Sequence, residues 1–156
     1  MSESVSKIDG FGTRRNLSGT EVENFEERKR FARFFTAEAI SKGDVVAIDV
    51  ATSTYGYGNS VKKANSGTNA ISCPVGVATA DIANGKIGEI QVGGLCDFAK
   101  ILDTNDDPGD LLGSSGTAGS LTIMAADDIL PCAILVVEGT ANTADSTIFL
   151  LNPANL

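Results

Sequence analysis

The residues whose types and spacing are best suited to chemistry lie in one acidic segment, "DTNDDPGD", at 103–110. Oxygen-bearing side chains alternate along its first half, as in the opening of a calcium-binding loop, at Asp103, Asn105 and Asp107. The pattern then fails, because Pro108 stands where that loop needs glycine and Ser114 where it needs a bidentate glutamate. The segment is therefore predicted to be an acidic surface turn, with Pro108 and Gly109 at the centre of a type II turn.

No other motif supports catalysis. The chain contains no histidine, which excludes a Ser/His/Asp triad, a Cys/His pair and an imidazole zinc site. The glycine-rich segments 56–61 and 113–119 lack, respectively, the third glycine of a dinucleotide fingerprint and the lysine of a phosphate loop. Two carboxylates could still meet as an acid and base pair, as in glycosidases, but carbohydrate sites commonly use aromatic platforms and the chain has no tryptophan. We therefore expect no enzymatic activity, no cofactor and no metal.

Three cysteines, Cys73, Cys96 and Cys132, lie apart from one another in apolar or small-residue surroundings. They form no C-x-x-C pair, so neither a metal site nor a redox motif is indicated. Small sulfur side chains commonly behave as core residues, and an odd number argues against a secreted disulfide framework. The sequence therefore predicts three buried, reduced thiols.

Length and composition indicate one soluble, β-rich domain. A chain of 156 residues can bury a substantial core without disulfides or metals, and its 17 glycines favour a β body over a helical bundle. The first twelve residues lack the apolar core of a signal peptide, and the run "AILVV" at 133–137 is too short to cross a bilayer. A net charge of -8 argues against direct binding to nucleic acid.

Charge divides the chain into two parts. Residues 1–36 contain seven Lys/Arg and six Asp/Glu, a net charge of +1, whereas residues 37–156 contain five and fourteen, a net charge of -9. The first twenty residues are polar, contain several Ser and Gly, and have no sustained period, so they could bury little surface alone. We expect residues 1–36 to form an extended N-terminal arm and residues 37–156 to form a β-rich domain.

The end of the arm allows two local structures. Thr20 with Glu23 has the form of a capping box, and Glu26 with Arg30 is a favourable helical pair, which together suggest a short helix at 21–30. The segment "KRFARFFTAE" at 29–38 also fits a strand. In that case Phe31, Arg33 and Phe35 lie on one face, and Ala32 and Phe34 lie on the other. The phenylalanines are expected either to pack into the core or to anchor the arm on a partner.

From residue 37 onward, short apolar segments alternate with turn residues, which predicts strands. A strand is expected at 45–50 after a Lys-Gly-Asp turn, and 73–98 indicates two strands joined by a turn at Asn84 and Gly85. Further strands are predicted in "CDFAKILD", "LLG", "SLTIMA", "PCAILVVE" and "STIFLLN". The Gly-, Ser- and Asn-rich segment 51–70 is predicted to be a long connection, either mobile or in contact with a partner.

The two halves of the β region share a faint repeat. Ala83, Asn84 and Ile90 recur 58 positions later as Ala141, Asn142 and Ile148. This spacing suggests only two similar hairpins.

The order of these segments resembles a family of small tailed-bacteriophage head proteins that decorate or cement capsids. The resemblance covers roughly residues 34–151 and rests on "FFTAEAISKGDVVAI", "CPVGVATADIANGKIGEIQVGGLCDFAK", "DPGDLL" and "ILPCAILVVEGT". It is a pattern of turns and strands, without a catalytic signature. It implies a compact β-barrel or β-tulip-like domain, commonly a homotrimer, on the outer surface of the virion head and bound to the major capsid protein.

The resemblance and the charge pattern together predict a capsid-binding set in the arm and at its junction with the body. The set comprises Arg14, Arg15, Phe31, Arg33, Phe34 and Phe35. A receptor- or glycan-binding β module of a phage fibre or appendage is the alternative, although such modules usually show repeats or exposed aromatic residues. Neither function requires a membrane.

Overall fold

The computed structural model describes residues 7–8, 14–15, 29–103, 106–125 and 131–151. The described residues contain strands and one short 3-10 turn, η2 (Asn69–Ile71), and no α-helix. The mainly β fold predicted from the sequence is therefore confirmed. The strands are β1 (Lys7–Ile8), β2 (Arg14–Arg15), β3 (Arg30–Thr36), β4 (Val45–Ile48), β5 (Ser60–Lys63), β6 (Pro74–Ala78), β7 (Ile87–Ala99), β8 (Leu111–Ser114), β9 (Leu121–Ile123), β10 (Ala133–Val137) and β11 (Ser146–Leu150).

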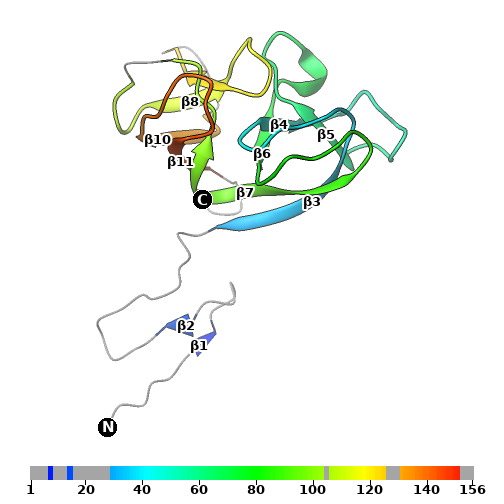
Figure 1. The fold of residues 1–156 in the computed structure, drawn as a ribbon, viewed down its shortest axis with the longest axis horizontal. Helices are drawn as coiled ribbons and strands as arrows, with labels where there is room; N and C mark the ends of the chain where they lie inside the picture. Colours follow the sequence, from blue (N-terminus) through cyan, green and yellow to red (C-terminus); the bar gives the residue numbers. More distant parts are fainter. Residues whose placement is uncertain (1–6, 9–13, 16–28, 104–105, 126–130, 152–156) are drawn as a thin grey trace.

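Five strands close a first barrel. They pair in the order β3-β5-β4-β6-β7, and β3 returns to pair with the first half of β7, so that the ring has no free edge (Figure 1). β3 is parallel to β5, with Thr36 paired with Val61, and antiparallel to β7, with Phe35 paired with Ile87. The apolar residues that point inward form one buried cluster: Ile40, Val46, Val61, Ala78, Ile82 and Ile90. The apolar side chains on the inward face of the strands thus fill the barrel.

A second, smaller ring of strands uses the other half of β7. This strand is 13 residues long, and its end pairs with β11, which is followed by β10, β8 and β9. Ile101, just after β7, bridges in parallel to Leu121 of β9 and closes the ring. One long strand therefore belongs to both barrels and joins them covalently (Figure 1).

The two barrels have the same strand order and connections. The first is β5-β4-β6-β7 closed by β3, and the second is β9-β8-β10-β11 closed by the end of β7. The turns before β4 and β8, at 41–44 and 107–110, also match: in each, the closing aspartate donates its N–H to the carbonyl of the first residue at 3.0 Å and accepts the N–H of that residue with its carboxylate. The hairpin similarity seen in the sequence therefore extends to two whole barrels.

The outer surface of the first barrel closes the core of the second. Val45, Ala47 and Val77 point away from the first barrel and belong to the same buried cluster as Leu112 and Ile148 of the second. Backbone hydrogen bonds strengthen this joint, since the loop between β8 and β9 lies along β4 and the residues after β5. The described body, residues 29–151 with the gaps given above, is thus two barrels with a shared interface.

Two boundaries predicted from the sequence are corrected. The predicted arm, residues 1–36, includes a barrel strand, because β3 pairs with both β5 and β7. The alternation at 29–38 was therefore the correct interpretation of that segment, whereas the alternative helix at 21–30 falls almost entirely outside the described residues. The described part of the arm contributes β1 and β2, which pair antiparallel with Lys7 opposite Arg15.

The predicted long connection at 51–70 also contains a strand. β5 lies within it, and Ser60 and Val61 are fully buried between β3 and β4. This strand carries a single large apolar residue, so no local alternation marks it. Its burial comes from pairing with β3, which is distant in the sequence, and local patterns cannot indicate such a contact.

Candidate functional site

Four of the six residues predicted to bind a capsid lie on one strand. Phe31, Arg33, Phe34 and Phe35 all belong to β3. The other two, Arg14 and Arg15, form β2 and pair with β1, and their side chains lie outside the description. The site can therefore be built only from β3 and its neighbours.

The two-residue period of β3 separates its phenylalanines. Phe34 packs against the core cluster of the first barrel, opposite Gly88 of β7. Its neighbours Phe31 and Phe35 alternate with it and so point outward, together with Arg33. Phe34 is therefore partly buried and lies on the core side of β3, opposite to the side that carries Phe31, Arg33 and Phe35.

The outward residues of β3 lie beside those of β7. Phe35 is opposite Ile87, and Arg33 is opposite Glu89. Tyr55, from the connection between β4 and β5, stacks on Phe35 with ring centroids 4.7 Å apart and planes 10° from parallel. We call this surface the β3–β7 face, made of Phe31, Arg33, Phe35, Tyr55, Ile87 and Glu89.

The β3–β7 face has the composition of a binding surface. Phe31 is 47% exposed and Ile87 is 53% exposed, so two large apolar side chains meet solvent on neighbouring strands. Arg33 and Glu89 are also exposed and alternate with them. Apolar side chains with charged neighbours are typical of protein interfaces.

Sequence reasoning did not find Tyr55 or Ile87 as members of this face. Ile87 could have been found from the alternation of Ile87, Glu89 and Gln91, because the strand continues in register with β3. Tyr55 gave no such signal, since it reaches Phe35 only through the folded β4–β5 connection. Its aromatic neighbour Tyr57 is 73% exposed in the same loop.

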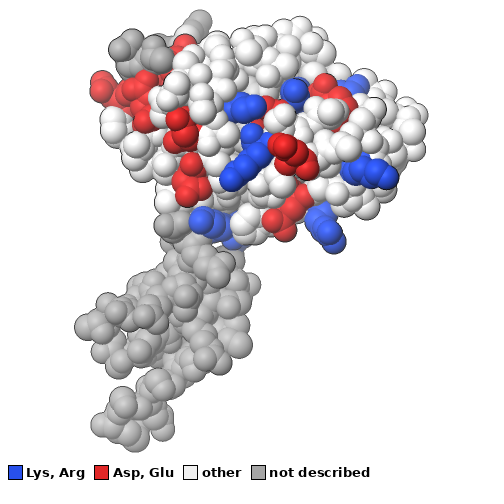
Figure 2. Space-filling view, viewed as in Figure 1, with Lys and Arg blue, Asp and Glu red and all other residues white. Residues whose placement is uncertain are grey.

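Charged side chains are unevenly distributed over the visible surface. Figure 2 shows acidic groups gathered over the side where β8 and β10 lie, and basic and acidic groups interspersed over β3 and β7. The net charge of -8 is therefore not spread uniformly. The region of β3 and β7 therefore carries charges of both signs.

The acidic segment 103–110 is used for local structure. The Asp103 carboxylate accepts hydrogen bonds from the Thr122 hydroxyl and the Ile123 N–H. Gly109 has φ +102° and the N–H of Asp110 donates to the carbonyl of Asp107, which confirms a turn with glycine at its third position. Among the residues that the structure describes, no group of three or more Cys, Asp or Glu side chains is placed to hold a metal ion.

Asp106 is the buried carboxyl of this segment. It is 6% exposed, and burial raises its pKa, as do, to a lesser degree, the charges of Asp103, Glu138 and Asp110. All of these neighbours are acidic, so they add repulsion without supplying a counter-charge.

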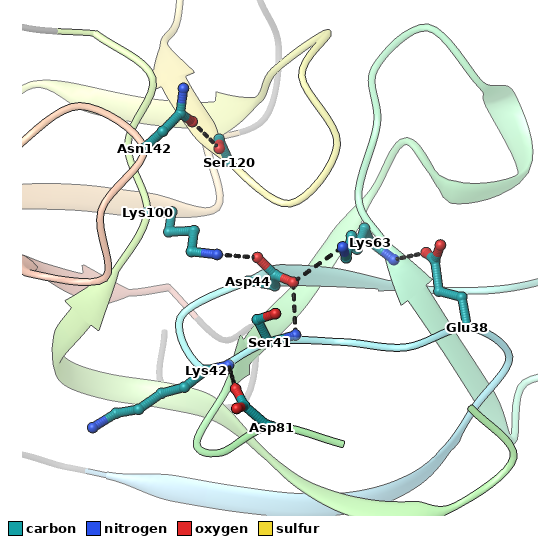
Figure 3. Close-up of polar contacts among 9 residues, drawn as sticks. All are labelled: Glu38, Ser41, Lys42, Asp44, Lys63, Asp81, Lys100, Ser120 and Asn142. Carbon is teal, nitrogen blue, oxygen red and sulfur yellow. Dashed lines mark hydrogen bonds and ion pairs between the residues drawn. The ribbon is translucent and has the colours of Figure 1, made fainter. Parts of the chain in front are cut away.

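A buried carboxylate with several partners, Asp44, lies where the two barrels meet. Its carboxylate accepts a hydrogen bond from the Lys100 ammonium at 2.6 Å and from the Ser41 N–H at 2.8 Å, and it lies 3.5 Å from the Lys63 ammonium (Figure 3). Lys63 comes from the first barrel and Lys100 from the segment that closes the second. Because the partners of the Asp44 carboxylate come from both barrels, we assign this cluster to holding the joint.

The three cysteines are free thiols in different surroundings. Cys96 is buried, and this burial raises its pKa to about 11. Burial also raises the pKa of Cys132 to about 12, and its thiol donates to the Leu112 carbonyl at 3.3 Å. Cys73 is exposed, so the prediction of burial is wrong for this residue: it stands just ahead of β6, where the chain enters the barrel from the surface.

No described helix is long and apolar enough to cross a membrane.

No protein-family model matches the chain, and no curated protein matches it. Among solved structures, the chain is similar to the head fibre gp8.5 N base in bacteriophage phi29, with a TM-score of 0.53 and 13% sequence identity. The match covers 80% of this chain and 98% of that chain. The two proteins therefore share a fold over nearly all of the phage protein base.

Proposed function

We propose that this protein is a structural component of a tailed-phage head, a decoration or cement protein that binds the outer surface of the assembled capsid through the β3–β7 face. The observation that carries the proposal is this face itself, where exposed apolar and charged residues lie on two paired strands directly after the N-terminal segment. The fold shared with a phage head fibre base supports a place on the virion head. The major capsid protein is the proposed partner.

The proposed mechanism is thermodynamic linkage. A protein that binds the assembled shell, and not its dissociated subunits, stabilises the shell by mass action. The barrels suit this role because their strands close into rings and present a rigid surface that need not be ordered on binding. Repetition at every equivalent position of the shell multiplies a modest contribution from each copy.

Occupancy of purified heads tests the proposal. The Phe31→Asp variant of the full chain is compared with Thr143→Asp, which adds the same charge to an exposed turn of the second barrel. Burying one phenylalanine contributes about 1.5 to 3 kcal/mol, so we expect Phe31→Asp to raise the Kd for heads by about tenfold or more. The Thr143→Asp variant is expected to bind like the unmodified protein.

Two outcomes contradict this assignment of the surface. In one, Phe31→Asp binds heads as tightly as the unmodified protein while remaining folded by circular dichroism. In the other, both variants lose binding equally, which indicates that any added negative charge is harmful. Either result requires a different contact surface, and binding to isolated capsid subunits alone would contradict the cement role.

A second candidate is a receptor- or glycan-binding module of a phage fibre or appendage. The fold likeness favours it, because the similar structure is the base of a head fibre. A fibre module is expected to bind glycans or host receptors, whereas a cement protein is expected only to raise the temperature at which heads dissociate. Glycan-array binding together with no effect on head stability would favour this candidate.

A further inference from the structure

The first half of β3 extends past the closed ring of the first barrel. Only Phe35 and Thr36 pair with β5, although β3 is seven residues long. The ladder ends there because the Asn59 N–H, which would be next to reach the Arg33 carbonyl, donates instead to the Gly56 carbonyl at 3.1 Å. Figure 1 shows this half of β3 at the lower rim of the body, beside β7. Ahead of Phe35, one edge of β3 therefore pairs with none of the described strands.

The backbone groups on this edge can be assigned residue by residue. Alternate residues of an antiparallel strand direct their N–H and C=O groups to the same side. The Phe35 N–H donates to the carbonyl just ahead of β5 at 3.1 Å, so the N–H and C=O groups of Arg33 and Phe31 point to that side as well. The Glu89 carbonyl, opposite Arg33, accepts the Thr79 N–H at 3.3 Å and so faces away from β3. Within the described part of the chain, these two donors and two acceptors have no hydrogen-bond partner.

An open strand edge of this kind is a template for another strand. Charged side chains on an edge can instead protect it against pairing, and Arg33 alone would fit that role. The side chains beside this edge are largely apolar, however, because Phe31 is 47% exposed and Phe35 stacks on Tyr55. The residues with free backbone groups thus also supply the outward side chains of the β3–β7 face. This combination favours an edge that accepts a strand over one that repels it.

The charge of this edge favours an acidic partner. Residues 29–33, "KRFAR", contain three basic residues and no acidic one, in a chain whose net charge is -8. Arg33 makes no ion pair with any residue that the structure describes. Its acidic neighbour Glu89 lies on β7, on the other side of β3 from the free edge. An added strand would lie about 4.8 Å from β3 and about twice that distance from β7, so its side chains would meet Arg33 before Glu89.

We propose that an extended segment of the major capsid protein pairs with the free edge of β3 and adds a strand to the first barrel. The backbone of this segment bonds to the N–H and C=O groups of Phe31 and Arg33. Its outward side chains, two residues apart, are an apolar residue beside Phe31 and an acidic residue beside Arg33. This inference rests on the proposed function, since it specifies which element of the capsid meets the β3–β7 face.

Matched substitutions at Arg33 test the proposal with the full chain and purified heads. Arg33→Ala removes the charge and keeps the N–H on the edge, whereas Arg33→Pro removes both and directs the proline ring toward the added strand. Proline is tolerated where the N–H of an edge strand points to solvent, so both variants are expected to fold. We expect Arg33→Ala to raise the Kd for heads by about two- to fivefold, and Arg33→Pro to raise it by about a further tenfold.

Hydrogen exchange resolved to single residues gives a second readout that needs no substitution. In the free protein, the amides of Phe31 and Arg33 are expected to exchange quickly, and those of Ala32 and Phe34, which face β7, to exchange slowly. Binding to heads is expected to slow the exchange of Phe31 and Arg33 by about tenfold or more. Contact through side chains alone would leave these two amides without a hydrogen-bond acceptor.

The possible failures can be told apart. Phe31→Pro and Phe31→Ala replace the Arg33 pair if Arg33→Pro is unfolded by circular dichroism. Equal binding of the matched Ala and Pro variants, or fast exchange of both edge amides on heads, would overturn the added strand and leave the capsid proposal in place. If the unmodified protein does not bind heads, the capsid proposal fails and this inference fails with it.

Discussion

The two barrels have the same strand order and nearly the same turns, but they differ at the positions where one barrel meets the other. Gly43 and Gly109 occupy equivalent turns with positive φ, yet a side chain would meet neighbouring atoms only at Gly43. Asp44 and Asp110 make the same turn hydrogen bond, yet only Asp44 also binds lysines. Both barrels therefore use the same few turn residues. In the first barrel, these residues also make contacts where the two barrels meet.

The largest difference is expected for glycine replacement. A Cβ added at Gly43 would lie 2.4 Å from the Ala144 Cβ and 2.5 Å from the Phe98 carbonyl oxygen, whereas one added at Gly109 meets no atom within 4 Å. Both glycines have positive φ, so an alanine at either position would also be strained. We expect Gly43→Ala to lower the free energy of unfolding by about 2 to 5 kcal/mol and Gly109→Ala by about 1 to 2 kcal/mol in urea titrations. Equal effects would mean that the joint is not closely packed.

Replacement of the equivalent aspartates, Asp44 and Asp110, is also expected to destabilise the protein to different extents. Asp44→Asn leaves the ammonium groups of Lys100 and Lys63 without their counter-charge, although both lysines are partly exposed. We expect a loss of about 2 to 3 kcal/mol in the free energy of unfolding, below the range for fully buried pairs. Asp110→Asn keeps a turn acceptor and is expected to cost less than about 1 kcal/mol. The same urea titration compares the two variants, and a larger cost for Asp110→Asn would refute this view of the joint.

The stability of the protein at acid pH is expected to depend on a carboxylate of the first barrel, Asp49. Burial alone would raise the pKa of Asp49, but hydrogen bonds from Thr52, Lys62 and the Ala51 N–H lower it to about 2, from 3.8. A depressed folded-state pKa contributes stability above pH 3.8 that is lost as the pH falls through about 2, and a shift of this size corresponds to about 2 kcal/mol. We therefore expect Asp49→Asn to be less stable than the unmodified protein at pH 5, and this difference to shrink toward pH 2.

The matched control for this pH dependence is Ser115, the equivalent residue of the second barrel. Its hydroxyl accepts the Thr117 N–H at 3.1 Å, as Asp49 accepts the Ala51 N–H, but it carries no charge. The cost of Ser115→Ala is expected to be the same at pH 5 and pH 2. A constant cost for Asp49→Asn over this range would show that its carboxylate is not stabilised by its neighbours.

The smallest effect concerns thiol reactivity, which leaves stability unchanged. Cys73 is exposed, while burial raises the pKa of Cys96 to about 11 and that of Cys132 to about 12. Iodoacetamide at pH 8 is expected to modify Cys73 first, and the other two only after unfolding, because the thiolate is the reactive form. Mass spectrometry of the alkylated protein measures the order. Equal modification of Cys96 in the folded state would contradict the burial of the second-barrel core.

Local chemistry was enough to predict most strands and turns. The alternation in β7 and β11 and the glycine turns at Gly85 and Gly109 depend only on neighbours in the sequence, and both are present in the structure. β5 could not be predicted, because its burial depends on distant pairing. The repeat was visible only in part, because the two barrels share turn residues such as Gly43 and Gly109 while their core side chains differ in size.

The β3–β7 face could be predicted only in part for the same reason. The alternation of β3 identified which residues share a side, but it could not say which side faces the core. In the structure, Phe34 lies opposite Gly88 and packs against the cluster that contains Ile82, which occupies the space beside Gly88. The contribution of Tyr55 depends on the folded connection between β4 and β5, which no local pattern indicates.

Electron cryomicroscopy of heads incubated with the full chain tests directly whether the β3–β7 face binds the capsid. We expect density for the two barrels on the outer surface, with β3 and the first half of β7 against the capsid and Phe31 and Ile87 at the contact. A reconstruction in which the β3–β7 face points to solvent, while another surface of the body meets the shell, would contradict it.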